Sequence, residues 1–126
     1  MAKTTGRLVR VKLTSGNITR GIINYLTVKG HLAFRIQSTG LWDPVKKQFR
    51  QSGSKKGVAD IICCYGGKFL SIEVKNEKTH DRIRPDQITF SRDVAAAGGI
   101  YIIARSYKAF TDWYESQELQ KEGVTL

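Results

Sequence analysis

Hydrophobic residues recur along the chain with two different periods, and the period separates predicted helices from predicted strands. Apolar residues three and four positions apart predict three helices, over about 16–29, from Pro85 to the Gly98-Gly99 pair, and over about 107–120. Short or alternating apolar runs predict four strands, over 31–37, about 58–65, about 68–75 and 100–104. The last run is entirely apolar, so we expect that strand to be buried on both faces.

Local signals set the ends of the predicted elements. Ser15 suits the N-cap of the first helix and Gly30 its end, and Pro85 suits the first turn of the second helix. Residues 38–57 show no regular period, and a loop of that length in a small domain is usually functional. Residues 1–14 are basic and partly alternating, which predicts an N-terminal arm or a short edge strand.

The order of these elements predicts a single α/β domain over residues 1–126. A helix stands between the third and fourth strands, which allows a crossover and therefore a parallel pair in an otherwise antiparallel sheet. We expect a central mixed β-sheet flanked by helices. A chain of this length can bury roughly two thirds of the surface that its unfolded form exposes.

Charge bears on what the domain binds. The chain has 21 Lys and Arg against 11 Asp and Glu, for a net charge of +10. This excess favours a polyanionic partner such as nucleic acid, although a basic surface that only aids solubility is the alternative. No segment approaches the ~20 apolar residues of a membrane span, and the polar, basic start has no signal-peptide core. We therefore expect a cytoplasmic protein.

The two cysteines, Cys63 and Cys64, are adjacent on a predicted strand and so face opposite sides of it. They do not have the spacing of a Cys-x-x-Cys motif, and the chain offers only His31 and His80 as further nitrogen ligands. This pattern argues against a structural zinc site. We expect both cysteines to be small core residues.

Three charged residues on neighbouring strands carry the candidate chemistry. A Gly66-Gly67 turn joins the two strands, and if they pair as a hairpin, Asp60 comes close to Glu73. Lys75 then points to the same side as Glu73, because side chains alternate along a strand. Two carboxylates at an apolar centre suit a hard divalent cation with oxygen ligands, to which the Val74 carbonyl could add a third. The alternative is a solvated ion-pair cluster, which is common on exposed strands.

Basic side chains near this cluster are candidate contacts to a phosphate backbone. They are Arg35, Lys46, Lys47, Arg50, Lys55, Lys56, Lys78, Arg82 and Arg84. Arg35 suits two uses equally, a phosphate contact or a structural partner for a carboxylate. Trp42 and Phe49 stand among the lysines of the longer loop. They could stack on unpaired bases at a junction, but aromatic residues more often cap a core or a subunit interface.

These motifs, in this order, resemble the PD-(D/E)xK nuclease superfamily and, more closely, its VRR-NUC family of phage and replication-repair nucleases. The matching segments are 57–62, 67–75, 84–90, 97–101 and 104–106. Upstream, 18–26 and 33–35 look like the first helix and strand of the family. The resemblance covers nearly all of residues 16–115.

The resemblance implies a restriction-endonuclease-like core, a Mg²⁺ cofactor that Mn²⁺ can replace, and DNA as substrate. It makes Asp60 and Glu73 metal ligands, Lys75 the catalytic lysine, and Gln87 a catalytic-site residue that hydrogen-bonds a ligand or a metal-bound water. A solvent-facing helix residue is the alternative for Gln87. Free-standing phage members look like homodimers that cut branched DNA such as Holliday junctions, whereas the larger Fanconi-associated relative is a flap nuclease.

Two positions depart from the superfamily pattern. Ala59 stands where the superfamily name expects proline, which changes local rigidity and removes no ligand. The first helix carries Asn17 near the position where many relatives have a glutamate, so the pattern gives that helix no acidic ligand for a second metal.

The sequence therefore predicts a metal-dependent endonuclease for structured or branched DNA, of the kind that takes part in recombination and repair. Two alternatives stay open. One is a flap nuclease or nickase that works with a helicase. The other is a non-catalytic basic DNA-binding module whose acidic pair is structural.

Overall fold

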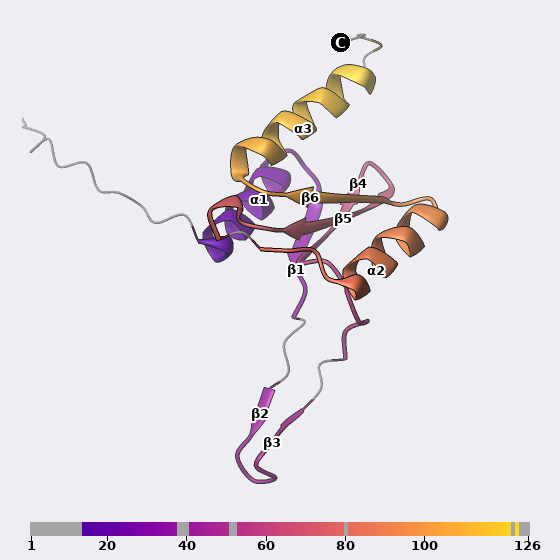
Figure 1. Ribbon diagram of the computed structural model, residues 1–126. Helices are drawn as coiled ribbons and strands as arrows, with labels where there is room; N and C mark the ends of the chain where they lie inside the picture. Colours follow the sequence, from indigo (N-terminus) through magenta and orange to yellow (C-terminus); the bar gives the residue numbers. More distant parts are fainter. Residues whose placement is uncertain (1–13, 38–40, 51–52, 80, 122, 124–126) are drawn as a thin grey trace, which may run out of the picture.

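The computed structural model describes residues 14–37, 41–50, 53–79, 81–121 and 123. The predicted N-terminal arm lies outside these residues except for Thr14. The elements are α1 (Ser15–Val28), β1 (Leu32–Arg35), β2 (Leu41–Asp43), β3 (Gln48–Arg50), β4 (Ile61–Tyr65), β5 (Lys68–Val74), the short 3-10 helix η1 (Glu77–Thr79), α2 (Pro85–Ala96), β6 (Ile100–Ala104) and α3 (Tyr107–Lys121) (Figure 1).

A mixed four-stranded sheet forms the centre of the fold, in the order β1-β4-β5-β6. The pairs β1·β4 and β4·β5 are antiparallel, whereas β5 and β6 are parallel. The parallel pair is possible because α2 carries the chain back between β5 and β6. The predicted α/β class and mixed sheet are confirmed.

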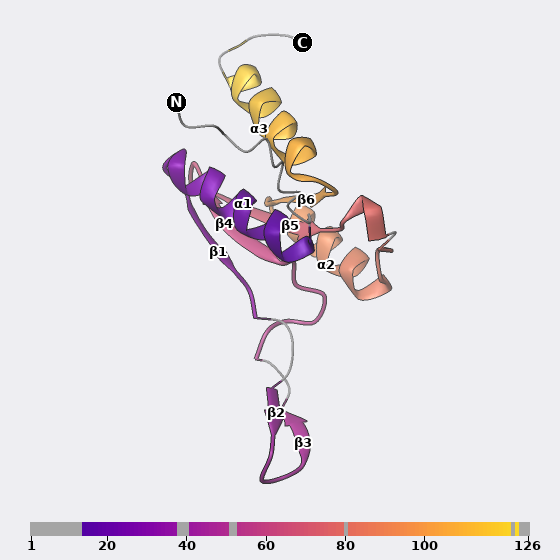
Figure 2. The same cartoon turned by 90° about the vertical axis from the view of Figure 1, so that its left-hand side faces the viewer.

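Helices cover the two faces of this sheet, with α1 on one face and α2 on the other (Figure 2). The larger core lies under α1 and α3, where side chains such as Ile22, Ile72 and Phe110 are fully or almost fully buried. A smaller core forms where Phe90 and Val94 of α2 pack on Ala59. Because side chains alternate along β5, every second side chain of that strand enters the larger core, and the side chains between them face the α2 side.

Four local predictions change in the structure. Thr14, rather than Ser15, is the N-cap of α1, since its Oγ1 accepts the N–H of Asn17 at 3.1 Å. The strand β6 is only partly buried over most of its length, because it is the edge strand of the sheet. Cys63 is buried as expected, but Cys64 is exposed, because α2 packs against β6 and does not reach that part of β4.

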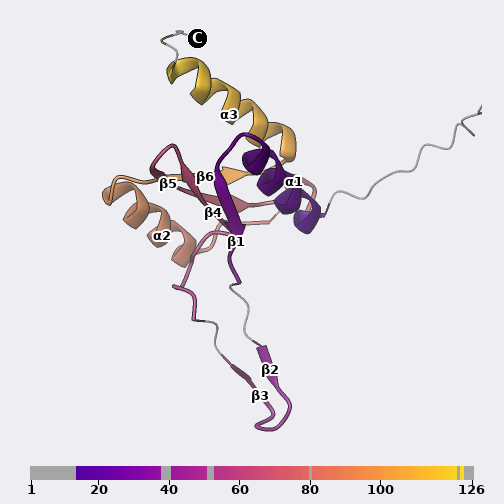
Figure 3. The ribbon, with the colours of Figure 1, turned by 180° about the vertical axis from the view of Figure 1, so that it is seen from behind.

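The fourth difference is a hairpin within the segment predicted to be irregular. The strands β2 and β3 pair antiparallel and project from the sheet (Figure 3). Asp43 and Pro44 supply the turn signal, and Asp43 Oδ1 accepts the N–H groups of Val45 and Lys46 at 2.9 and 3.1 Å. Of the helices in the described part of the chain, none is long and apolar enough to cross a membrane.

Candidate active site

The hairpin of β4 and β5 brings Asp60 and Glu73 together. Ile61 pairs with Ile72 in the antiparallel register of β4 and β5. Asp60 directly precedes β4, so continuing this register by one residue places it opposite Glu73. The backbone holds Asp60 on both sides. Its carbonyl accepts the N–H of Ile36 at 2.9 Å, and its Oδ2 accepts the N–H of Val74 at 2.8 Å. The predicted meeting of the two carboxylates is confirmed.

Glu73 is a buried carboxylate with only part of its hydrogen-bonding capacity used. Its Oε1 accepts the side-chain N–H of Gln87 at 3.1 Å and lies 3.9 Å from the Lys75 Nζ. Its Oε2 has no hydrogen-bond partner among the described residues. Burial and the charge of Asp60 raise the pKa of Glu73 to about 8, against the opposing charges of Lys75 and Arg84.

Gln87 connects the start of α2 to Glu73. Its side-chain oxygen accepts the N–H of Arg84 at 2.9 Å, as the third helical residue does in a capping box, while its amide donates to Glu73. With 3% exposure it is buried, so the solvent-facing alternative is wrong. The amide therefore fixes the position of one carboxylate oxygen relative to a helix end.

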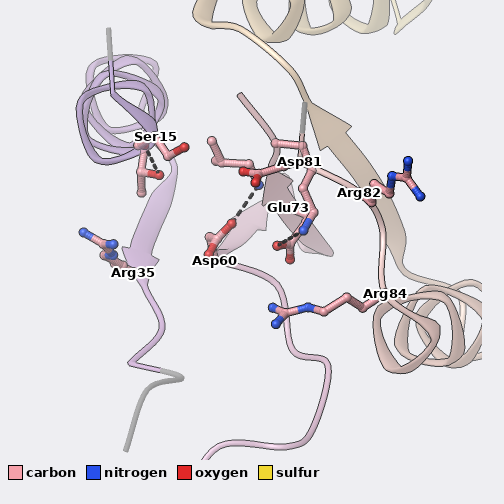
Figure 4. Close-up of a pocket in the computed structure, with 10 residues that line it drawn as sticks. Ser15, Arg35, Asp60, Glu73, Asp81, Arg82 and Arg84 are labelled. Atoms are coloured by element: carbon pink, nitrogen blue, oxygen red, sulfur yellow. Dashed lines mark hydrogen bonds and ion pairs between the residues drawn. The ribbon is translucent and has the colours of Figure 1, made fainter. Parts of the chain in front are cut away.

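A pocket of about 380 Å³ opens beside these groups (Figure 4). It is lined by Ser15, Thr19, Arg35, Asp60, Glu73, Val74, Lys75, Asp81, Arg82 and Arg84. Four cationic and three acidic side chains thus surround one cavity. A cavity with this balance suits a phosphate group together with a cation.

Three lining residues were absent from the predicted site. Ser15 and Thr19 reach the pocket because α1 begins beside the end of the sheet, a tertiary arrangement that no local pattern reports. Asp81 stands between basic residues in the loop before α2, and the basic character of that loop predicted only a set of phosphate contacts. A lone acid within a basic loop is the signal that could have identified it.

The predicted phosphate contacts divide between the pocket and more distant surfaces. Arg35, Arg82 and Arg84 line the pocket. Lys46 and Lys47 lie in the turn of the β2–β3 hairpin, and Lys55 and Lys56 line a separate hollow beside α2. Lys78 lies exposed in η1, and the side chain of Arg50 is outside the described part of the structure. For Arg35, the structure records no ion pair with another described residue, which favours the phosphate contact.

The donor set fits a hard divalent cation. Within the described residues, no group of three or more His, Cys, Asp and Glu side chains is arranged so that it could hold a metal ion. Two carboxylates, Asp60 and Glu73, are enough for Mg²⁺, which usually keeps several of its waters. The Oε2 of Glu73 is a buried oxygen without a partner among the described residues, and a cation bound there would both coordinate it and favour its ionised form. Val74 lines the pocket, and the role of its carbonyl stays a prediction.

Two further polar residues lie behind Glu73. Ser71 and Tyr101 face each other in the β5·β6 register, on the α2 side of the sheet. Their hydroxyls and Glu73 Oε2 are the buried side-chain atoms that lack partners in the described part of the chain. Burial, followed by the charges of Glu73 and Asp60, raises the pKa of Tyr101 to about 12. Unmade hydrogen bonds are therefore concentrated around one carboxylate, which is typical of a functional site.

Gly57 brings the Asp60 segment against the start of α2. Its φ is +78°, and a Cβ atom there would lie 2.2 Å from the Asp86 carbonyl oxygen. We expect Gly57→Ala to lower the free energy of unfolding by about 2–4 kcal/mol, from the left-handed backbone and the clash together. Urea unfolding measures this loss. Gly53→Ala is the matched control, because nothing lies within 4 Å of its Cβ position. If Gly57→Ala and Gly53→Ala lowered the free energy of unfolding by the same small amount, the expectation would be wrong.

Comparisons with known proteins identify the fold. A search of solved structures finds a VRR_NUC domain, with a TM-score of 0.61 over 82% of this chain and 97% of that chain, at 16% sequence identity. No protein-family model matches the sequence, and a search of curated proteins finds no match. The chain therefore has the restriction-endonuclease-like fold of a VRR_NUC domain, as the motifs predicted.

Proposed function

We propose that this chain is a metal-dependent endodeoxyribonuclease of the VRR-NUC family. One observation carries the proposal, namely the half-buried Asp60 and the buried Glu73 side by side, with Glu73 Oε2 unpartnered among the described residues and Lys75 beside it in a pocket lined by four cationic side chains. The VRR_NUC-like fold and the net charge of +10 support it. A cation held between Asp60 and Glu73 would account both for the two carboxylates lying side by side and for the unpartnered Oε2 of Glu73.

Asp60 and Glu73 would hold Mg²⁺ or Mn²⁺, with the Val74 carbonyl as a further ligand. The ion would supply Lewis-acid stabilisation of the phosphate and an activated water. Gln87 keeps one Glu73 oxygen in position through the 3.1 Å hydrogen bond, and so leaves Oε2 for the ion. The N–H of Val74 likewise holds Asp60 Oδ2 in position through a 2.8 Å hydrogen bond, which leaves Oδ1 for the ion.

Lys75 is the electrophilic side chain of the site. It directly follows β5 and is 6% exposed, so its ammonium is held where water competes little for it. In hydrolysis, the water oxygen bonds to phosphorus, the bond from phosphorus to the 3′ oxygen breaks, and that oxygen gains a proton. The products are a 5′-phosphate and a 3′-hydroxyl. Lys75 would orient the water and stabilise the negative charge that grows on the phosphate oxygens.

Arginines at the edge of the pocket would bind the DNA backbone. Arg35 comes from β1, and Arg82 and Arg84 come from the loop before α2; the Arg84 side chain extends toward the carboxylate pair, whereas those of Arg35 and Arg82 extend away from it at the rim of the pocket (Figure 4). One guanidinium group can bind two oxygens of the same phosphate, and such contacts fix the position of the DNA backbone relative to the protein. Such contacts select backbone shape rather than base sequence, which suits an enzyme for structured DNA.

Symmetric cutting of branched DNA requires two active sites, and we propose a homodimer for this reason. An apolar face supports a second copy as partner. Leu32, Phe34, Ile62, Cys64 and Phe69 lie on the part of the sheet that α2 leaves open, and Leu32 is 67% exposed. Exposed apolar areas of this kind often mark protein interfaces. Sedimentation velocity at micromolar concentration gives the mass of the species in solution.

Cleavage of four labelled substrates tests the nuclease directly. Duplex, single strand, 5′ flap and four-way junction are each incubated with Mg²⁺, with Mn²⁺ and with chelator at one fixed ionic strength. We expect cutting with either ion and none with chelator, with the junction cut fastest. A preference for the flap would instead identify a flap nuclease. Tight binding without cutting under all conditions would overturn the proposal and leave a binding module.

A further inference from the structure

The hairpin of β2 and β3 carries an aromatic pair that the fold does not use. Trp42 is directly opposite Phe49, with ring centroids 5.3 Å apart and ring planes at 70°. Their exposed fractions are 54% and 70%. Neither ring belongs to the two hydrophobic cores, and the hairpin projects from the sheet (Figures 1 and 3). This excludes the reading of the pair as a cap on the core.

Exposed aromatic rings are poor stabilisers of a fold and good surfaces for stacking. Because Trp42 and Phe49 meet edge to face, they do not cover each other, and a ring face stays open to solvent. Every nucleic-acid base has a flat face that can stack on such a ring. In a duplex these faces are already stacked on neighbouring bases, so an unpaired base is the better partner.

Lysines in the turn supply the charge that a nucleic-acid strand requires. Lys46 and Lys47 are exposed beside the aromatic pair. Asp43 is engaged with the backbone N–H groups of Val45 and Lys46, which fixes the turn. Lys47 has a φ of +52°, so the turn is sharp at the residue that precedes β3. Aromatic and cationic side chains together match the usual composition of single-strand binding surfaces.

The chain connects this hairpin to both sides of the candidate active site. It leaves from the end of β1, where Arg35 lines the pocket, and returns to Asp60. Of the described residues outside the hairpin, Gln37 and Ser54 are joined directly, because Ser54 Oγ donates to the Gln37 carbonyl at 2.6 Å. The hairpin is therefore attached to the fold through residues that border the pocket.

We propose that the β2–β3 hairpin binds unpaired bases of the DNA substrate. Trp42 and Phe49 form the stacking surface, and Lys46 and Lys47 contact the phosphates on either side of the stacked bases. This inference deepens the proposed nuclease function, because it names DNA with unpaired bases next to the cut as the substrate class. The hairpin then recognises an open or branched region while the pocket binds the adjacent backbone.

Binding without cutting tests this proposal. The full chain is titrated, in chelator and at fixed ionic strength, into a labelled thymidine homopolymer and into a blunt duplex of equal length, with fluorescence anisotropy as readout. We expect the Trp42→Ala, Phe49→Ala double variant to weaken single-strand binding by about tenfold or more and duplex binding by less than about threefold. Trp42→Phe should restore part of the single-strand affinity, since it keeps an aromatic face.

Val45→Ala is the matched control. Val45 is 89% exposed in the same hairpin and has no aromatic ring, so its removal should leave both affinities unchanged. Equal weakening for single strand and duplex, or no weakening for single strand, would overturn the proposal. So would a shift from dimer to monomer in sedimentation that accounts for the loss, because the pair would then be a contact between two copies. The binding measurement requires no cleavage, so it tests the hairpin even if the nuclease assay shows no cutting. Conversely, a negative result for the hairpin does not contradict the proposed nuclease activity.

Discussion

Lys75→Ala is expected to lower the rate of DNA cutting by about a hundred- to a thousandfold while DNA binding changes only a few-fold. Lys75 is one lysine among many cationic side chains, so its loss removes a small part of the attraction for phosphate. Its contribution to cutting is larger, because its ammonium lies 3.9 Å from Glu73 in a buried position. There it can stabilise charge that develops only in the transition state.

The measurement is single-turnover cutting of the preferred substrate with saturating Mg²⁺, together with binding of the same DNA in Ca²⁺ or chelator. Lys75→Met serves as a second variant, because it keeps the apolar stem and protects the packing around the buried side chain. Lys108→Ala is the control for loss of one positive charge, since Lys108 is exposed on α3 and pairs with Asp112. Cutting within about threefold of wild type in both Lys75 variants would remove this lysine from the catalytic site.

The positions of the carboxylates could be predicted because they depend on one short hairpin. Asp60 and Glu73 are joined by two strands and a tight turn at Gly66-Gly67, so strand alternation and turn length set both the face and the register. Lys75 follows from the same alternation. Gln87 was identified by the resemblance to a family, and the structure explains its use, because the first turn of α2 passes next to Glu73.

The remaining features depend on how distant elements pack. No local pattern places Ser15 or Thr19 beside the pocket, because that position depends on where α1 crosses the sheet. The exposure of Cys64 depends likewise on how far α2 extends over β4. The β2–β3 hairpin could have been predicted from the sequence, because Asp43-Pro44 is a turn signal between two segments that each contain an aromatic residue. The lysines around it obscured the strand pattern and favoured an irregular loop.

Glu73→Gln is expected to abolish cutting and, at the same time, to stabilise the protein in the absence of metal. The wild-type carboxylate is buried beside Asp60, which raises its pKa to about 8 from the ordinary value of 4.5. A glutamine side chain carries no charge, still accepts the hydrogen bond from Gln87, and can donate one to Asp60. At pH 8.5 in chelator we expect the variant to be more stable by about 2 kcal/mol or more.

The sign of the pH dependence follows from the raised pKa. A folded-state pKa above the unfolded value means that the native protein retains the Glu73 proton more strongly, so the contribution of this group to stability is fully present below about pH 4.5 and is lost as the pH rises through about 8. Wild type and Glu73→Gln should therefore have similar stability near pH 5 and diverge towards pH 8.5. The difference comes from one carboxyl group, which is neutral at the lower pH and ionised at the higher.

Urea unfolding at pH 5, 6.5 and 8.5, with chelator and with Mg²⁺, measures both parts of this expectation. Mg²⁺ should raise the stability of wild type at pH 8.5, where an ionised Glu73 is available as a ligand, and should have little effect on Glu73→Gln. Glu77→Gln is the control, because Glu77 is exposed in η1 and outside the pocket. A variant less stable than wild type at every pH would show that the Glu73 carboxylate supports the fold itself, and would remove the main reason for placing a cation beside it.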